Sequence, residues 1–280
     1  MILPELILTN RIGQCWDFTG LDQLAQCKDK VHFKSYPYSI QYKYNSRGFR
    51  DQEWPIGIED LKTAIWCIGD SFTVGLGSPI QHTWPYQLSS IAQQRVINVS
   101  MDGASNEWIA RMVQHIVHDI TPKNIVIMWS YVHRRELADT LLGNEDRRKH
   151  FVKSSNEEDW QNFLNCKARV DSITKSTQFA IPGFSPDILD LEKCWESIRG
   201  FAWPTSVPGT LNELSQLPQW ILSEMDVLHN CLHQFQNTLM LKENLGVTSV
   251  KKQDLARDGA HFDLVTAGWV AQQAMSEMDL

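Results

Sequence analysis

Three residues have side chains that could together activate a nucleophile. Ser71 follows the apolar run "IWCIGD", whereas Asp258 and His261 lie close together in "ARDGAHFD", near the end of the chain. A serine hydroxyl becomes a good nucleophile when a histidine takes its proton and a carboxylate orients that histidine. Gly259 lies between Asp258 and His261, so one tight loop can present both side chains. These residue types and spacings predict a Ser-His-Asp site.

A simpler interpretation of each motif stands beside this one. Gly-Asp-Ser is a common tripeptide, and taken alone Ser71 would be the N-cap of a buried helix. An isolated Asp-x-x-His pair carries even less information. The two motifs occur in order, the first after a predicted strand and the second before the last predicted helix. This order favours the chemical interpretation over the helix cap.

The elements that would position these residues alternate along the chain. Short apolar runs predict strands buried on both faces, and apolar residues at helical spacing predict the helices between them. Strand, helix, strand, helix, strand indicates an α/β fold: a three-layer α/β/α sandwich with a flavodoxin-like parallel sheet of about five strands. In such a sheet, Ser71 and the Asp258 loop would meet at the carboxyl ends of the strands. We predict strands at 63–69, 95–101 and 123–130 and helices at 84–94, 106–120, 156–173, 217–246 and 263–278, with loops at 181–209.

The first 60 residues differ from the rest. In "SYPYSIQYKYNSRGFRD" the apolar side chains share one parity, as in a half-buried strand, and "NSRGF" is typical of a turn. The residues of that parity are Tyr36, Tyr38, Ile40, Tyr42 and Tyr44. We therefore predict an N-terminal extension at 1–60 that packs on a main domain at 61–280.

The motifs resemble those of a known family. "GDSF" at 69–72, Gly103 after the second strand and Asp-Gly-Ala-His at 258–261 are similar to blocks of the SGNH (GDSL) hydrolases, over about 64–130 and 255–278. The resemblance implies that Ser71 is the nucleophile, His261 the base and Asp258 its partner. It also implies an oxyanion hole that includes the amides of Ser71 and Gly103. The aromatic segment before "GDSF" resembles a subgroup found in marine bacterial and phage sequences.

One block departs from the family pattern. After the third strand the family usually has Gly-x-Asn-Asp, whose Asn donates a further oxyanion hydrogen bond, but this chain has "MWSYVHRRE". Losing such a donor costs about 3 kcal/mol of transition-state stabilisation. Candidates to replace it are Asn106, Ser130 and Arg134, of which we favour Asn106. Arg134 or Arg135 could instead bind an anionic group of the substrate, although such basic clusters are usually solvated loops.

Together these features predict hydrolysis of a carboxylic ester through an acyl-enzyme. The resemblance makes an O-acetyl group on a carbohydrate the first choice of substrate. Two alternatives remain open: an O-acyltransferase that uses the same residues, and a non-catalytic binding or virion-associated module that keeps the fold. The 11 tryptophans are compatible with sugar stacking, but core and surface packing is the preferred explanation.

Composition and charge limit the remaining possibilities. The 280 residues carry a net charge of -7, which disfavours nucleic acid as a partner because there is no excess of basic side chains. No run of about 18 apolar residues and no cleavable signal is seen, so we expect no membrane partner and a cytoplasmic or virion-associated protein. The six scattered cysteines predict reduced thiols. The oligomeric state is left open.

No metal or other cofactor is expected. Histidine pairs at 115 and 118 and at 229 and 233 have helical spacing, but neither pair has a third ligand nearby in the sequence. Solvated histidines are the preferred interpretation.

Overall fold

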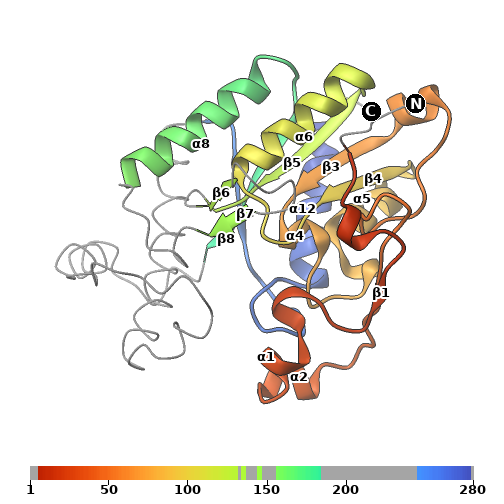
Figure 1. The fold of residues 1–280 in the computed structure, drawn as a ribbon, viewed down its shortest axis with the longest axis vertical. Coiled ribbons are helices and arrows are strands. Elements are labelled where there is room, and N and C mark those ends of the chain that lie inside the picture. Colours follow the sequence, from red (N-terminus) through yellow and green to blue (C-terminus); the bar gives the residue numbers. More distant parts are fainter. Residues whose placement is uncertain (1–5, 132–133, 137–143, 147–155, 184–244, 279–280) are drawn as a thin grey trace.

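A computed structural model describes residues 6–131, 134–136, 144–146, 156–183 and 245–278. Within these residues the central sheet has five strands, in the order β4-β3-β5-β8-β9 (Figure 1). All neighbouring pairs run parallel. The strands are β3 (Ile65–Gly69), β4 (Val96–Ser100), β5 (Asn124–Trp129), β8 (Thr177–Gly183) and β9 (Thr248–Lys251). Numbered along the chain, this is the flavodoxin-like order 2-1-3-4-5, so the predicted fold class is confirmed.

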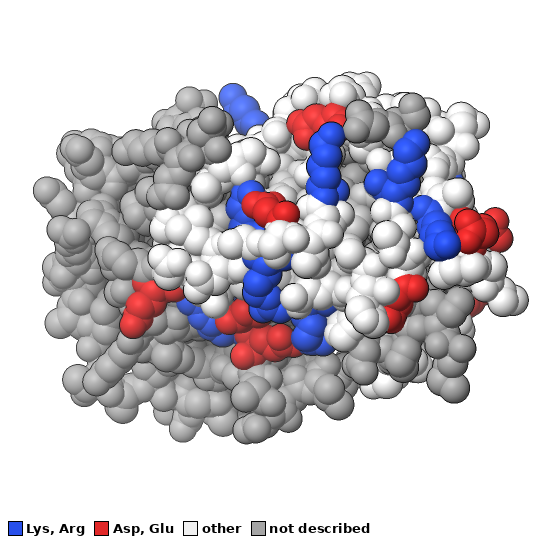
Figure 2. All heavy atoms as spheres, turned by 90° about the horizontal axis from the view of Figure 1, so that it is seen from above, with Lys and Arg blue, Asp and Glu red and all other residues white. Residues whose placement is uncertain are grey.

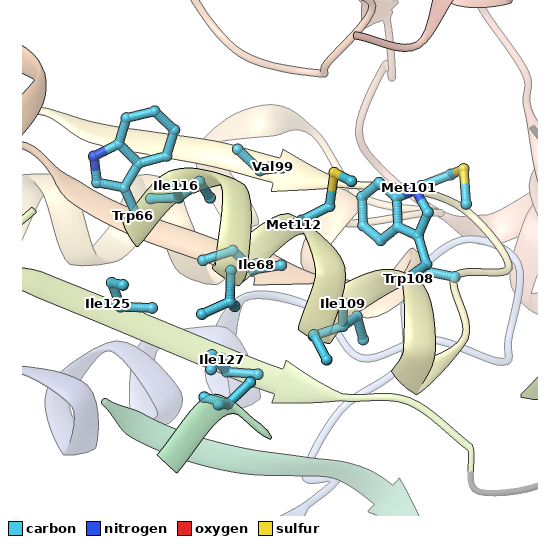
Figure 3. Close-up of a cluster of buried hydrophobic side chains, with 14 of the residues drawn as sticks. Trp66, Ile68, Val99, Met101, Trp108, Ile109, Met112, Ile116, Ile125 and Ile127 are labelled. Atoms are coloured by element: carbon cyan, nitrogen blue, oxygen red, sulfur yellow. The ribbon is translucent and has the colours of Figure 1, made fainter. Parts of the chain in front are cut away.

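Helices cover both faces of the sheet. On one face lie α6 (Asn106–Asp119) and α8 (Asn156–Asp171), and on the other α5 (Trp84–Ala92) and α12 (Leu264–Glu277). Side chains of β3 alternate between the two cores: Trp66 and Ile68 pack toward α6, as Figure 3 shows, and Ile65 and Cys67 pack toward α5 and α12. This burial on both faces explains why the strand is a continuous apolar run.

Shorter elements complete the described chain. They are the 3₁₀ turns η1 (Thr9–Arg11), η2 (Gly20–Asp22) and η3 (Ile80–His82), the helices α1 (Leu24–Cys27), α2 (Val31–Ser35), α3 (Ile58–Thr63) and α4 (Ser71–Val74), and the strands β1 (Cys15–Trp16), β2 (Tyr42–Lys43), β6 (Arg134–Glu136) and β7 (Asn144–Asp146). β1 pairs with β2 and β6 with β7, both antiparallel.

The predicted elements and the observed ones agree where the sequence is strongly patterned. The predicted strands match β3, β4 and β5, and the predicted helices match α5, α6, α8 and α12. Strands β8 and β9 were not predicted, and β8 begins before the stretch assigned to loops. The predicted helix at 217–246 and the rest of the loop stretch lie almost wholly outside the described residues.

The N-terminal segment at 6–57 has little regular structure but is closely attached to the rest. Ile40, Tyr42 and Tyr44 are buried as their parity predicts, whereas Tyr38 is 47% exposed, so the strand prediction is wrong there. Within the stretch predicted as a strand, all of which is described, only Tyr42–Lys43 pairs as one. The buried Arg50 donates to the carbonyls of Val74, Gly75 and Ser78, at 3.1, 2.6 and 2.8 Å. This arginine thus binds the carbonyl end of α4, where a cation is favoured.

The described tryptophans belong mostly to the core. Trp66, Trp84 and Trp129 are fully buried, and Trp108 is 3% exposed. These four rings are therefore explained by packing rather than by contact with a sugar. In the face that Figure 2 shows, basic and acidic side chains are interspersed. Among the described residues, no helix has the length and apolar character that crossing a membrane requires.

Candidate active site

Ser71 begins a one-turn helix immediately after β3. Gly69 ends the strand, and a Cβ there would lie 2.1 Å from Oγ1 of Thr73 and 3.0 Å from the carbonyl oxygen of Met128, so the close turn requires glycine. The N-cap of α4 is Asp70, whose carboxylate accepts from the amide of Phe72 at 3.0 Å. The cap position is therefore filled by the neighbour of Ser71, and the simple helix-cap interpretation of Ser71 is wrong.

Asp258 and His261 lie on the loop between β9 and α12. Oδ1 of Asp258 accepts from the amides of Ala260 and His261 at 2.9 and 3.0 Å. Its other oxygen, Oδ2, is 2.5 Å from Nδ1 of His261, and Nε2 of that imidazole is 2.8 Å from Oγ of Ser71. Two backbone amides thus fix the carboxylate that orients the imidazole toward the serine.

The protonation of this pair follows from its surroundings. Burial alone raises the pKa of Asp258, but the imidazole and the two amides outweigh burial and hold that pKa below its usual range. Burial alone lowers the pKa of His261, and the carboxylate of Asp258 outweighs it, so that pKa is raised. An ionised carboxylate only accepts, so the proton of the neutral imidazole lies on Nδ1 and the lone pair of Nε2 faces Ser71. His261 can therefore take the hydroxyl proton.

The loop after β5 packs on the other side of Asp70. Oδ2 of Asp70 accepts from Oγ of Ser130 at 2.8 Å and from the guanidinium of Arg134 at 2.9 Å. The guanidinium also donates to the carbonyl of Ala104 at 3.4 Å and lies 4.5 Å from the centre of the Tyr131 ring. Burial raises the pKa of Asp70, and Arg134 opposes that rise. Arg134 is thus the ionic partner of a buried carboxylate.

The sequence predicts that Arg134 could bind substrate, and the structure gives its guanidinium a partner inside the protein. Its side chain is only 11% exposed and is bound to Asp70 inside the protein. Arg135 is half-buried and donates to the carbonyls of Arg134 and Glu158, at 3.3 and 3.4 Å. Both guanidinium groups therefore have hydrogen-bond partners within the protein.

Asn106, which the sequence analysis favours as an oxyanion donor, also has its partners inside the protein. Its Nδ2 donates to the carbonyls of Ser130 and Tyr131 at 3.1 and 3.4 Å, and its Oδ1 accepts from the amide of Ser130 at 2.8 Å. The side chain is fully buried and joins the start of α6 to the end of β5. Because its two donors serve backbone carbonyls, Asn106 does not replace the missing oxyanion donor in this geometry.

The backbone amides of Ser71 and Gly103 are the other predicted oxyanion donors. Gly69 and Ser100 are paired in register on neighbouring strands, so Ser71 and Gly103 follow strands that end at the same edge. Gly103 has φ 78°, a left-handed conformation that glycine adopts without strain, and a Cβ there would meet no atom within 4 Å. Within the described part of the chain, neither amide has an intramolecular acceptor.

One of the two histidine pairs noted in the sequence lies within the described residues. In the described ranges no three His, Cys, Asp or Glu side chains form a group suited to a metal ion. His115 and His118 are described and lie on α6, whereas the pair at 229 and 233 lies outside the described residues.

Some residues that hold the site together were missed by sequence reasoning. Arg50, Asp22 and Arg257 are three of them, and each binds a partner at least 24 positions away. The only available signal was a charge in an otherwise apolar or turn context, as in "RGFRD" for Arg50. Such a signal does not identify a partner.

Comparison with known proteins finds solved structures but nothing at the sequence level. No protein-family model and no curated protein matches the chain. A putative lipolytic protein of the G-D-S-L family from Desulfitobacterium hafniense is 12% identical with a TM-score of 0.41, covering 76% of this chain and 98% of its own. A G-D-S-L family member from Veillonella parvula is 10% identical with a TM-score of 0.43, covering 77% and 100%.

A third match is the psychrotrophic esterase EstA from Pseudoalteromonas, 10% identical with a TM-score of 0.37, covering 77% of this chain and 95% of its own. Likeness at this level leaves the function of this chain to be inferred from its own residues.

Proposed function

We propose that this chain is a carboxylic ester hydrolase that works through an acyl-enzyme on Ser71. The observation that carries the proposal is the continuous chain of contacts from Ser71 through His261 to Asp258, with 2.8 and 2.5 Å between the joined atoms. It lies at the carboxyl ends of β3 and its neighbours, beside the point where the strand order reverses, which is where ligands bind in sheets of this kind.

The reaction follows from this geometry in two halves. Nε2 of His261 takes the proton of Ser71, whose Oγ forms a bond to the ester carbonyl carbon while the carbonyl electrons move to its oxygen. The amides of Ser71 and Gly103 donate to that oxyanion. The intermediate then collapses, the bond to the leaving oxygen breaks, and His261 gives its proton to the leaving alcohol. In the second half, His261 takes a proton from a water molecule, whose oxygen attacks the carbonyl carbon of the acyl-enzyme. The bond to Oγ of Ser71 then breaks, His261 returns the proton to Ser71, and the carboxylic acid is released.

Within the class of carboxylic esters, a more specific substrate can be proposed. We propose a short acyl group, with an O-acetyl group on a carbohydrate as the first choice, on the strength of the motif resemblance. The nucleophile is only 3% exposed, and the ring of Phe72 lies 4.5 Å from the ring of His261, which supports a small acyl group at the serine. Acetate released from acetylated oligosaccharides, compared with butyrate released from butyrylated ones, tests this choice.

The proposed activity is tested with p-nitrophenyl acetate at pH 8. The unmodified protein is expected to hydrolyse it, Ser71→Ala to lose that rate, and Ser90→Ala, a change at an exposed serine on α5, to keep it. No rate above background would contradict the proposal and favour the non-catalytic alternative. Adding a sugar acceptor separates the remaining alternative, because an acyltransferase would form an acetylated sugar in place of free acetate.

A further inference from the structure

The residue before Asp258 is bound by the N-terminal segment. Nε of Arg257 donates to both carboxylate oxygens of Asp22, at 3.0 and 3.2 Å, and the terminal nitrogen Nη2 donates to Asp22 and to the carbonyl of Asp17. The guanidinium carbon lies 5.1 and 5.0 Å from the ring centres of Phe18 and Phe33. Asp22 is fully buried, so this ion pair has few competing water contacts.

Asp22 also connects to the loop that follows the nucleophile. It accepts from the hydroxyl of Tyr42 at 2.8 Å, and the same hydroxyl accepts from the amide of Gly77 at 2.8 Å. The carbonyl of Gly77 in turn accepts from the amide of Arg257 at 2.8 Å. One buried carboxylate therefore links the loop after α4 with the loop that carries Asp258.

These two loops meet at the carboxylate of Asp258. A Cβ on Gly77 would lie 3.0 Å from both Cγ and Oδ1 of Asp258, so the backbone of Gly77 packs directly on that carboxyl group. A displacement of the Gly77 loop or of Arg257 would thus move the carboxylate that orients His261.

Two more contacts from the N-terminal segment hold the same loop. Nζ of Lys30 donates to the carbonyl of Asp258 at 3.1 Å, and Nε2 of His32 is 3.0 Å from the carbonyl of Leu255. With Asp22 and Tyr42, these side chains form what we call the clasp: Asp22, Lys30, His32 and Tyr42. The clasp binds backbone and side-chain atoms within six residues of His261, and the backbone of Gly77 that packs on the carboxylate of Asp258.

We propose that the clasp is a positioning device for the acid-base pair, with the Asp22–Arg257 ion pair as its central contact. The proposal rests on the proposed function, because it assigns the N-terminal segment a part in the same reaction. Catalytic geometry is demanding, and a misplacement of about 1 Å costs roughly 100-fold in rate. The segment that carries the clasp is thereby required for turnover as well as for stability.

The test compares two ion pairs made by the same segment. Asp22→Asn breaks the clasp, and Asp51→Asn breaks the pair of Asp51 with Arg95, which precedes β4 at the opposite end of the strands. We expect kcat on p-nitrophenyl acetate to fall at least tenfold in Asp22→Asn, with KM changed less than threefold. In Asp51→Asn we expect kcat within twofold of the unmodified protein.

A spectroscopic readout keeps the clasp testable whatever the activity. A proton held between Nδ1 of His261 and Asp258 gives a far-downfield resonance in the proton NMR spectrum, assigned by its loss in His261→Gln. We expect this resonance to broaden or shift upfield in Asp22→Asn and to stay unchanged in Asp51→Asn. Tyr42→Phe, which removes one hydroxyl and no charge, is expected to give a smaller shift and serves if Asp22→Asn fails to fold.

The outcomes separate the clasp from the proposed function. If Asp22→Asn and Tyr42→Phe both leave the resonance as it is in Asp51→Asn, the clasp proposal is overturned, even in an active enzyme. If the resonance responds as expected but no protein hydrolyses an ester, the clasp stands as the support of the Asp258–His261 pair and the hydrolase proposal fails.

Discussion

The two sides of the candidate site differ in the groups that form them. One side consists of side chains and the other of backbone amides. On the base side, side chains bond to one another: Ser71, His261 and Asp258 are joined by contacts of 2.8 and 2.5 Å. On the oxyanion side, the side chains that could donate are bound elsewhere, Asn106 to backbone carbonyls and Arg134 to Asp70. In the proposed reaction, proton transfer therefore uses side chains, whereas oxyanion binding uses backbone amides.

The largest predicted effect falls on the base side. Asp258→Asn should lower kcat by about 10³- to 10⁴-fold, because the imidazole loses the carboxylate that fixes its tautomer. Asp263→Asn, a change at a second buried aspartate of the same loop, should keep kcat within about threefold. An equal loss of kcat in both variants would show that any substitution in this loop impairs activity. It would contradict a specific role of Asp258 in orienting His261.

The pH profile of the same variant sharpens this prediction. Asp258 raises the pKa of His261, and catalysis needs the neutral imidazole, so the rate should rise with pH through a midpoint above the ordinary histidine value of about 6.5. Removing the carboxylate charge should move that midpoint to lower pH. A midpoint that stays in place would mean that a different group is being titrated.

The second prediction concerns the oxyanion side and is an effect on stability. Arg134→Gln leaves Asp70 buried without its ionic partner and should lower the free energy of unfolding by about 3 kcal/mol or more. The double variant Asp70→Asn/Arg134→Gln should recover at least half of that loss, whereas Arg135→Gln alone should cost under about 1 kcal/mol. Urea unfolding measures all three. If Arg134→Gln is as stable as the unmodified protein but has a raised KM, this prediction is contradicted and Arg134 contacts the substrate.

The smallest predicted effect compares glycines on the two sides. Gly77 and Gly103 have φ of 75° and 78°, but a Cβ on Gly77 would lie 2.8 Å from Cβ of Ala256, whereas one on Gly103 would meet no atom within 4 Å. Gly77→Ala should therefore lower kcat about tenfold, and Gly103→Ala clearly less. Gly13→Ala, at φ 63° with open space around it, controls for the backbone strain alone. The reverse order for Gly77 and Gly103 would mean that the oxyanion side is the more sensitive one.

The residues of the base side could be predicted from the sequence, whereas the partners of Asn106 and Arg134 could not. Asp258 and His261 are three positions apart, so their spacing alone predicts that they meet, and the apolar run of β3 places Ser71 at the end of a buried strand. Asn106 was assigned from its nearness to Gly103 in sequence, but the first turn of α6 directs it to the backbone after β5. The pair of Asp70 and Arg134 spans 64 positions and has no local signature.

The missed strands have a physical cause as well. β8 begins with Thr177 and Gln178, which are buried yet polar, and Gln178 is accommodated because Trp129 donates to it at 2.9 Å. β9 is a four-residue strand at the edge of the sheet with one buried side chain, Val250. Neither has the apolar run that made β3, β4 and β5 recognisable.

The central claim is that Ser71 is an activated nucleophile, and a fluorophosphonate probe tests it most directly because labelling requires no knowledge of the substrate. The account predicts a single labelled peptide that contains Ser71, with labelling lost in Ser71→Ala and at least 100-fold slower in His261→Gln. Labelling of the unmodified protein at another serine, or no labelling under conditions that modify a known serine esterase, would contradict it.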